Sequence, residues 1–331
     1  MKGRHLVKVV SRKAEYCLAL ERKISVIKGK SGSGKTSVIR LIANFLELGK
    51  DSGIKVSVST SANLMVLFNS SKWEQELSNL HNTILFIDED VRFLYEVSFQ
   101  RTLWKSDCYA VIVSRSGMFT ALPFAISSVY QFATKKNGST TITYLYKYYE
   151  KKYKTYDFDM VLTEDSNSGF EMAKFAFNPE TVVLSASGNS NVLPTLFNQA
   201  KKYSHICIIV DGAAFGGFIE GVLKFSEIKL NTVISAPESF EYILLKSDFF
   251  KKYIKEELIK TYDYCDCLEY ITWERFYEDL IEKLTSQNFG FTYSKHTLNP
   301  FFMTKNCAKY FLKEISNYFV EKAKNEFAKV D

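Results

Sequence analysis

One stretch of sequence decides the fold of this chain: Gly29-Lys30-Ser31-Gly32-Ser33-Gly34-Lys35-Thr36, here called the glycine loop. It satisfies the pattern G-x-x-x-x-G-K-[ST] at every fixed position. An apolar run, Ile24 to Lys28, precedes it. From about Lys35 to Leu48 the apolar residues recur at helical spacing, and Gly49 is a natural stop for that helix. A strand that passes through a glycine-rich turn into a helix predicts an α/β fold.

The residue types in the glycine loop suit a phosphate ligand. Glycines let the backbone wrap closely around phosphate oxygens, and the start of the following helix adds its positive dipole end. In such a loop the lysine (Lys35) bridges the β- and γ-phosphates, and the hydroxyl of Thr36 ligates Mg²⁺. The residues expected to contact the nucleotide are Gly29, Ser31, Gly32, Ser33, Gly34, Lys35, Thr36 and Ser37.

Two further strand ends carry polar residues suited to the same site. The apolar run Thr83 to Ile87 ends in Asp88 and Glu89. Asp88 is expected to hold Mg²⁺ through water, and Glu89 to polarise the attacking water as general base. The run Tyr109 to Ser114 is followed by Arg115, so Ser114 could sense the γ-phosphate and Arg115 could neutralise it, in the same chain or in a partner subunit. A strand end with a solvated arginine fits equally well.

The first 150 residues resemble a known family. Strand-like runs at His5 to Val10 and Glu15 to Leu20, the glycine loop and the pair Asp88-Glu89 look like ABC/AAA-type P-loop ATPases with a catalytic glutamate beside the metal-binding aspartate. The interval between Lys35 and Asp88 is too short for the helical insertion and signature sequence of a full ABC ATPase. ABC-style dimer sandwiching is therefore not expected. No Asn-Lys-x-Asp motif is present, which favours ATP over GTP.

A second series of alternating strands and helices begins after a charged patch that ends near residue 154. We predict a P-loop ATPase domain with a mostly parallel sheet over residues 1–155, an α/β domain over 156–250, and a helical region over 251–331. In the second domain the predicted strands end in carboxylates, which would bring together Glu164, Asp211 and Glu238 or Glu241. Such a cluster favours Mg²⁺ or Mn²⁺. The alternative is a set of solvated or helix-capping acids.

This order resembles the Toprim fold of topoisomerases, primases and overcoming-lysogenization-defect nucleases. Glu164, Gly188 and Asp211 match the family pattern, in which a glutamate, a glycine and an Asp-x-Asp follow successive strands. Ala213 stands where the second aspartate is expected. This departure puts metal-dependent catalysis in doubt, because two-metal chemistry needs ligands on both ions.

The resemblances together imply an ATPase that gates a Toprim-like domain, which acts on or senses nucleic acid in phage defence. The tyrosines and lysines from Tyr144 to Tyr156 could form a stacking surface for a single strand, although tyrosines packed on the sheet explain them more simply. Ala213 favours the alternative, an ATP-dependent switch or scaffold whose inactive Toprim-like domain binds a protein partner. A homo-oligomer is compatible with both. A small-molecule kinase is less favoured, because Glu89 beside Asp88 suits hydrolysis.

Composition and cysteine spacing predict a cytoplasmic protein. The chain has 46% hydrophobic and 24% charged residues with a formal charge of +6, which permits nucleic-acid contact without requiring it. We expect no membrane span and no secretory signal. The six cysteines form no C-x-x-C pair, so we expect reduced thiols and no structural zinc.

Overall fold

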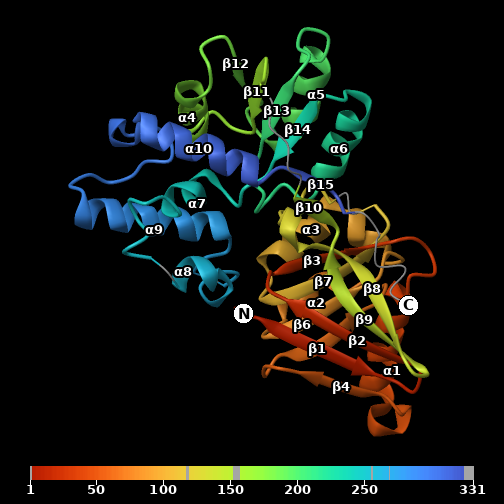
Figure 1. Ribbon diagram of the computed structural model, residues 1–331. Coiled ribbons are helices and arrows are strands. Elements are labelled where there is room, and N and C mark those ends of the chain that lie inside the picture. The colour runs from red at the N-terminus through yellow and green to blue at the C-terminus, as the bar shows by residue number, and fades with distance from the viewer. Residues whose placement is uncertain (1, 117–118, 152–156, 255, 268, 324–331) are drawn as a thin grey trace. The chain divides into compact units, whose positions relative to one another are not determined.

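The computed structural model describes residues 2–116, 119–151, 157–254, 256–267 and 269–323, and confirms an α/β fold (Figure 1). The chain divides into two compact units. Unit 1 contains Met1–Tyr149, Tyr262–Glu269 and Lys322–Asp331, and unit 2 contains Glu150–Thr261 and Tyr270–Glu321. The predicted three-part division at 155 and 250 differs from this one, because the C-terminal region contributes to both units.

Among the described residues, nine strands of unit 1 form one sheet in the order β4-β1-β2-β9-β8-β3-β7-β6-β5. Pairing is parallel from β8 to β5 and between β2 and β9, and antiparallel at β4-β1-β2 and β9-β8. The strands are β1 His5–Val10, β2 Ala14–Leu20, β3 Ile24–Lys28, β4 Lys55–Val58, β5 Asn63–Leu67, β6 Thr83–Ile87, β7 Cys108–Ser114, β8 Val129–Asn137 and β9 Thr140–Lys147.

The central strands β3, β6 and β7 are buried along their whole length, which explains why they read as continuous apolar runs. Helix α1 (Lys35–Leu48) packs against β1, β4 and β5 through a stripe that includes Val38, Ile39 and Ile42, as its spacing predicts. The other helices of this unit are η1 Gly49–Ser52, α2 Trp73–Ser78, η2 Arg92–Tyr95, α3 Val97–Lys105 and η3 Ile126–Ser128.

Unit 2 is built on a parallel four-stranded sheet in the order β12-β11-β13-β14. Helices α4 and α10 lie on one side of it, and α5 and α6 lie on the other (Figure 1). The elements are β11 Met160–Thr163, α4 Ser168–Ala176, β12 Val182–Ser185, α5 Asn189–Gln199, β13 Ile206–Ile209, α6 Ile219–Ile228, β14 Thr232–Ser235 and α10 Lys305–Asn317. The predicted alternation of strands and helices is confirmed, with helix ends shifted by a few residues.

The C-terminal part is largely helical, but it is not helical throughout. Helix α7 (Phe240–Leu245) packs on α9 (Trp273–Asn288). A short strand, β15 (Val320–Lys322), pairs with β10 (Tyr149–Lys151). The remaining elements are α8 Glu256–Ile259, η4 Thr261–Asp263 and η5 Pro300–Phe302. The sequence did not predict β5, β8 or β15.

Candidate functional site

The glycine loop and both predicted strand-end motifs of unit 1 share one edge of its sheet. Strand β7 lies between β3 and β6, and all three run parallel. The register pairs Lys28 with Ser114 and Ile87 with Ile112. The loop after β3 and the acids after β6 therefore flank the end of β7. Carboxyl ends of parallel strands are where ligands bind in open α/β sheets.

The backbone of the glycine loop requires its glycines. Gly32 and Gly34 have φ angles of +83° and +85°, a conformation that residues with a Cβ rarely adopt. A Cβ on Gly29 would lie 2.9 Å from Ser33 Oγ. Gly34 is also the N-cap of α1 and supplies no side-chain acceptor to the first turn. The amides there can therefore receive an anion, which the helix dipole also favours.

The ammonium group of Lys35 lies within this loop. It donates to the carbonyl oxygens of Gly29 at 2.6 Å and Lys30 at 2.9 Å, and to Ser33 Oγ at 3.2 Å. Burial lowers the pKa of Lys35 below its usual value, Glu89 opposes that shift and Arg115 adds to it. The charges of Glu89, after β6, and Arg115, after β7, therefore act on the ammonium group of Lys35.

The acids after β6 are held in a defined arrangement. Asp88 Oδ1 accepts from the backbone N–H of Glu89 at 2.7 Å. Glu89 Oε1 lies 2.8 Å from Nε of Arg115, which follows β7. The turn after the acids is fixed from β5, because the Asn69 side chain donates to the Asp90 carbonyl at 3.2 Å and accepts from Arg92 N–H at 2.8 Å.

Ser114 and Ser37 are engaged with two tyrosines that the sequence did not single out. Ser114 is fully buried; its Oγ lies 3.4 Å from the Tyr95 hydroxyl and accepts from Ser116 N–H at 3.2 Å. The hydroxyl of Tyr16 on β2 donates to Gly34 O at 3.3 Å and is hydrogen-bonded by Ser37. No sequence pattern marked Tyr16 or Tyr95, because Tyr16 reaches the glycine loop from β2 and Tyr95 reaches Ser114 from η2.

The donors of unit 1 fit a magnesium nucleotide. Thr36, at the start of α1, offers a half-buried hydroxyl. Asp88 and Glu89 are half-buried carboxyls at the same sheet edge, and the loop presents backbone amides and one ammonium. Oxygen donors suit Mg²⁺, and amides with a lysine suit phosphate oxygens.

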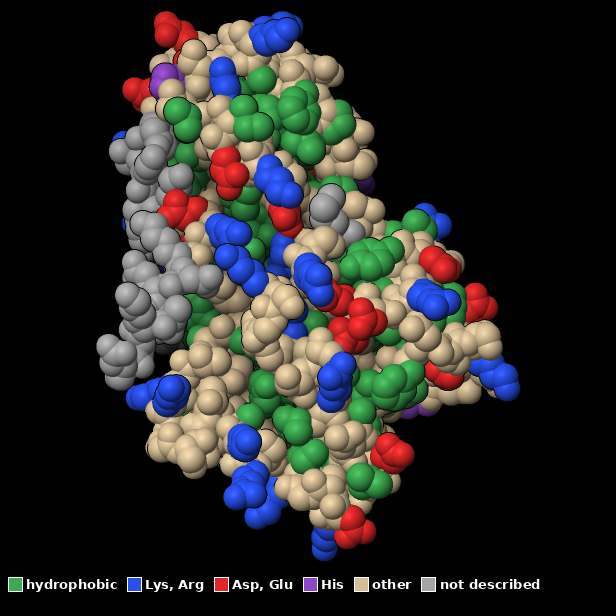
Figure 2. Space-filling view, turned by 90° about the vertical axis from the view of Figure 1, so that its right-hand side faces the viewer, with side chains coloured by type: hydrophobic (Ala, Val, Ile, Leu, Met, Phe, Trp, Pro, Cys, Tyr) green, Lys and Arg blue, Asp and Glu red, His purple; other side chains and the backbone are tan. Residues whose placement is uncertain are grey.

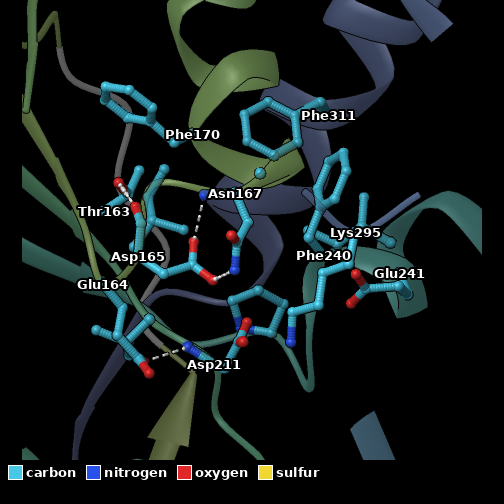
Figure 3. Close-up of a pocket in the computed structure, with 15 residues that line it drawn as sticks. Thr163, Glu164, Asp165, Asn167, Phe170, Asp211, Phe240, Glu241, Lys295 and Phe311 are labelled. Carbon is cyan, nitrogen blue, oxygen red and sulfur yellow. Dashed lines mark hydrogen bonds between the residues drawn. The ribbon is translucent and has the colours of Figure 1, made fainter. Parts of the chain in front are cut away.

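In unit 2 a pocket, here called the acidic pocket, forms where β11 and β13 end (Figure 3). Glu164 follows β11 and Asp211 lies just beyond β13, and Glu164 Oε2 accepts from Asp211 N–H at 3.0 Å. Glu241, in the first turn of α7, lines the same pocket. Glu238 is not among the residues that line it; its charge instead acts on Tyr242. The structure thus brings together Glu164, Asp211 and Glu241, which is one of the two clusters that the sequence predicts for the second domain.

Burial governs the ionisation of this pocket. Burial, together with the neighbouring carboxyls, raises the pKa of Glu164 to about 8 and the pKa of Asp211 well above its usual value. Burial also raises the pKa of Glu241, against the opposing charge of Lys295. Lys295 also lines the acidic pocket, and it was not predicted because it lies far along the chain from the other lining residues.

The predicted stacking surface from Tyr144 to Tyr156 is only partly visible, since residues 152–156 lie outside the described residues. Tyr148 carries the ammonium groups of Lys28 and Lys322 against its ring, at 5.0 and 5.2 Å from the centroid. Tyr144 is 45% exposed. Figure 2 shows Lys and Arg side chains interspersed with Asp and Glu on the face in view. These observations add little to the case for nucleic-acid binding.

Comparison with models of known protein families gives no match, and a search of curated proteins gives none either. Within the described part of the chain, no helix is long and apolar enough to cross a membrane. In the described part of the chain, Cys17, Cys108, Cys207, Cys267 and Cys307 form no disulfide bond.

Proposed function

We propose that unit 1 binds a nucleoside triphosphate with Mg²⁺ and hydrolyses it, with ATP as the favoured nucleotide. One observation carries this proposal: Lys35 sits inside a loop whose glycines adopt positive φ angles, at the sheet edge that also carries Asp88 and Glu89. A glycine turn with only a structural role would not need a buried ammonium group whose charge interacts with two carboxyl groups.

In the proposed reaction, Lys35 and the amides at the start of α1 stabilise negative charge on the β- and γ-phosphate oxygens. Thr36 and Asp88 would hold Mg²⁺, which would offset the negative charge that develops on the phosphate oxygens. Glu89 orients the attacking water and accepts its proton. Arg115 holds Glu89 in position and brings a second positive charge to the same edge.

Substitution at Lys35 tests the proposal. Lys35→Ala should abolish release of phosphate from ATP, whereas Lys30→Ala, which alters an exposed lysine of the same loop, should leave turnover within a few-fold of the parent. An equilibrium titration of both proteins with a fluorescent ATP analogue reports any loss of nucleotide affinity separately from the loss of hydrolysis. Hydrolysis at the parent rate by the Lys35→Ala protein would exclude this site.

For unit 2 we propose that nucleotide turnover in unit 1 controls a Toprim-like domain that acts on or senses nucleic acid, in defence against phage. The supporting observations are the adjacent ends of β11 and β13 and the acids that follow them. Incubation of the protein with single- and double-stranded DNA and RNA, with Mg²⁺ or Mn²⁺ and with or without ATP, tests catalysis. Cleavage that persists in both Glu164→Ala and Asp211→Ala would assign it elsewhere.

A second candidate is an ATP-dependent switch or scaffold whose second unit has no catalytic activity and binds a protein partner. Ala213 favours it, because its side chain cannot ligate a metal and its N–H donates to Glu238 O at 3.1 Å. The adjacent Gly212 is packed so closely that a Cβ there would lie 2.6 Å from Ala236 O. The loop after β13 is therefore fixed against the segment that leads into α7. Absence of cleavage with every nucleic acid would support this candidate.

A further inference from the structure

The acidic pocket of unit 2 holds more negative groups than its burial allows without compensation. Glu164, Asp165, Asp211 and Glu241 line it, and the charge of Glu274 on α9 acts on Asp211. Desolvation of several carboxylates is costly unless a cation or protons neutralise them. In a Toprim domain that cation is a divalent metal ion, which needs both room and oxygen ligands in the pocket.

The pocket already contains a cation of its own. Figure 3 shows the side chain of Lys295 extending into the pocket toward Asp211. Its Nζ forms an ion pair with Glu274, and Glu241 and Asp211 also act on its charge. Only 22% of the Lys295 side chain is exposed, so this charge is held within the pocket rather than in solvent.

The backbone at Lys295 is fixed so that its side chain enters the pocket. The carbonyl oxygen of Lys295 accepts from the backbone N–H of Ser168 at 2.9 Å and from the Ser168 hydroxyl at 2.8 Å. The same hydroxyl contacts the carbonyl oxygen of Ser294 at 2.9 Å. Because Ser168 begins α4, the segment that carries Lys295 is anchored to the helix beside β11. The fold therefore holds the segment that carries the ammonium group beside the acids.

Four carboxylate oxygens of the pocket already accept hydrogen bonds. Glu241 Oε1 accepts from the Tyr293 hydroxyl at 2.9 Å, and both oxygens of Asp165 accept from Asn167 (Figure 3 shows the latter pair). Glu164 Oε2 accepts from Asp211 N–H. Over the described ranges, no three His, Cys, Asp or Glu side chains are placed to hold one metal ion. The residues present do not fit Mg²⁺, which needs nearly octahedral oxygen ligands.

We propose that Lys295 takes the place of the divalent cation in the acidic pocket, so that unit 2 binds neither Mg²⁺ nor Mn²⁺ there. The lysine supplies one fixed positive charge to the pocket, protons on buried carboxyls such as Glu164 offset part of the remaining charge, and the lysine occupies the place that a metal ion would need. Unit 2 would then recognise its partner without metal-dependent phosphodiester chemistry, which requires bound ions. This inference stands on unit 2 alone and does not depend on nucleotide hydrolysis in unit 1.

Manganese titration followed by electron paramagnetic resonance tests this proposal on the full chain without nucleotide. Every protein carries Thr36→Ala, which removes a proposed metal ligand of unit 1. The parent and Asp211→Asn should bind the same amount of Mn²⁺. Lys295→Met should gain one Mn²⁺ site that the parent lacks, and adding Asp211→Asn should remove it. Lys283→Met, an exposed lysine of α9, is the matched control and should gain none.

Two results would overturn the proposal. One is a Mn²⁺ site in the parent that disappears in Asp211→Asn, since Lys295 would then not exclude the metal. The other is a Lys295→Met protein that retains its circular dichroism spectrum but gains no site. If Lys295→Met does not fold, the comparison of the parent with Asp211→Asn decides alone. Phosphate release from ATP, measured on chains with Thr36 intact, reports the function of unit 1 separately.

Discussion

Arg115 Nε lies 2.8 Å from Glu89 Oε1, so the side chains that follow β7 and β6 form an ion pair across adjacent strand ends. The Glu89 side chain is 16% exposed and the Arg115 side chain 69% exposed. The proposed base is thus sheltered, while its partner reaches solvent from the edge where the phosphates are proposed to bind. Because the Arg115 side of the pair is largely exposed, the pair contributes little to stability, and we infer that it positions Glu89 for the proposed reaction.

Arg115→Ala should lower kcat for ATP by about 100-fold, the usual cost of removing one group that stabilises transition-state charge. KM should change less than kcat, because the loop amides and Lys35 still bind the phosphates. Steady-state phosphate release measures both constants. Arg101→Ala, an exposed arginine of α3, is the control. An Arg115→Ala enzyme with parent kcat would show that the ion pair has no part in hydrolysis.

Glu89→Gln should retain nucleotide binding and lose hydrolysis by about 10²- to 10⁴-fold, because the amide orients water but cannot accept its proton. Binding of a fluorescent ATP analogue and single-turnover hydrolysis separate the two effects. Asp90→Asn, which alters the neighbouring exposed acid, should behave like the parent. Equal losses in both variants would mean that the turn, rather than the carboxyl of Glu89, had been disturbed.

Gly34→Ala should destabilise unit 1 by roughly 1–2 kcal/mol, the cost of a Cβ in the left-handed region, and should abolish nucleotide binding. The new Cβ would also lie 3.1 Å from the Tyr16 hydroxyl oxygen. Adding Tyr16→Phe should recover only the steric part of the loss. Gly49→Ala, at φ +57° with open space around it, should cost stability without weakening binding. Thermal unfolding and analogue titration measure the two quantities.

The stability of unit 2 should fall as pH rises from about 4.5 to about 8, because burial raises the pKa of Glu164 from 4.5 to about 8. The folded state keeps this proton over the range in which the unfolded chain releases it. Glu164→Gln should therefore flatten the pH dependence and stabilise unit 2 most at the alkaline end. The measurement is the urea unfolding midpoint of a Trp73→Phe/Trp104→Phe chain as a function of pH. Trp273 of unit 2 is the remaining tryptophan in this chain and reports the unfolding of that unit. A parent midpoint that rises with pH over this range would contradict it.

The parts of the structure that were predicted well are those encoded by neighbouring residues. Strand β3, the glycine loop and α1 agree with the structure because strand burial, positive φ angles and a helical stripe all leave short periodic patterns. The acids after β6 and β11 were found for the same reason. Glu238 shows the limit of this reasoning, because proximity in sequence to Glu241 does not bring its side chain into the acidic pocket.

By itself, the sequence determined the α/β class, the conformation of the glycine loop and the residue types on which the proposed phosphate chemistry rests. Only the tertiary structure decided that β7 separates β3 from β6, which pairs Arg115 with Glu89, and that Lys295 enters a pocket whose acids, Glu164, Asp211 and Glu241, lie far earlier in the chain. It also decided that Tyr262–Glu269 belongs to unit 1. Contacts between distant segments depend on how whole elements pack, so they leave no local pattern of residues from which to predict them.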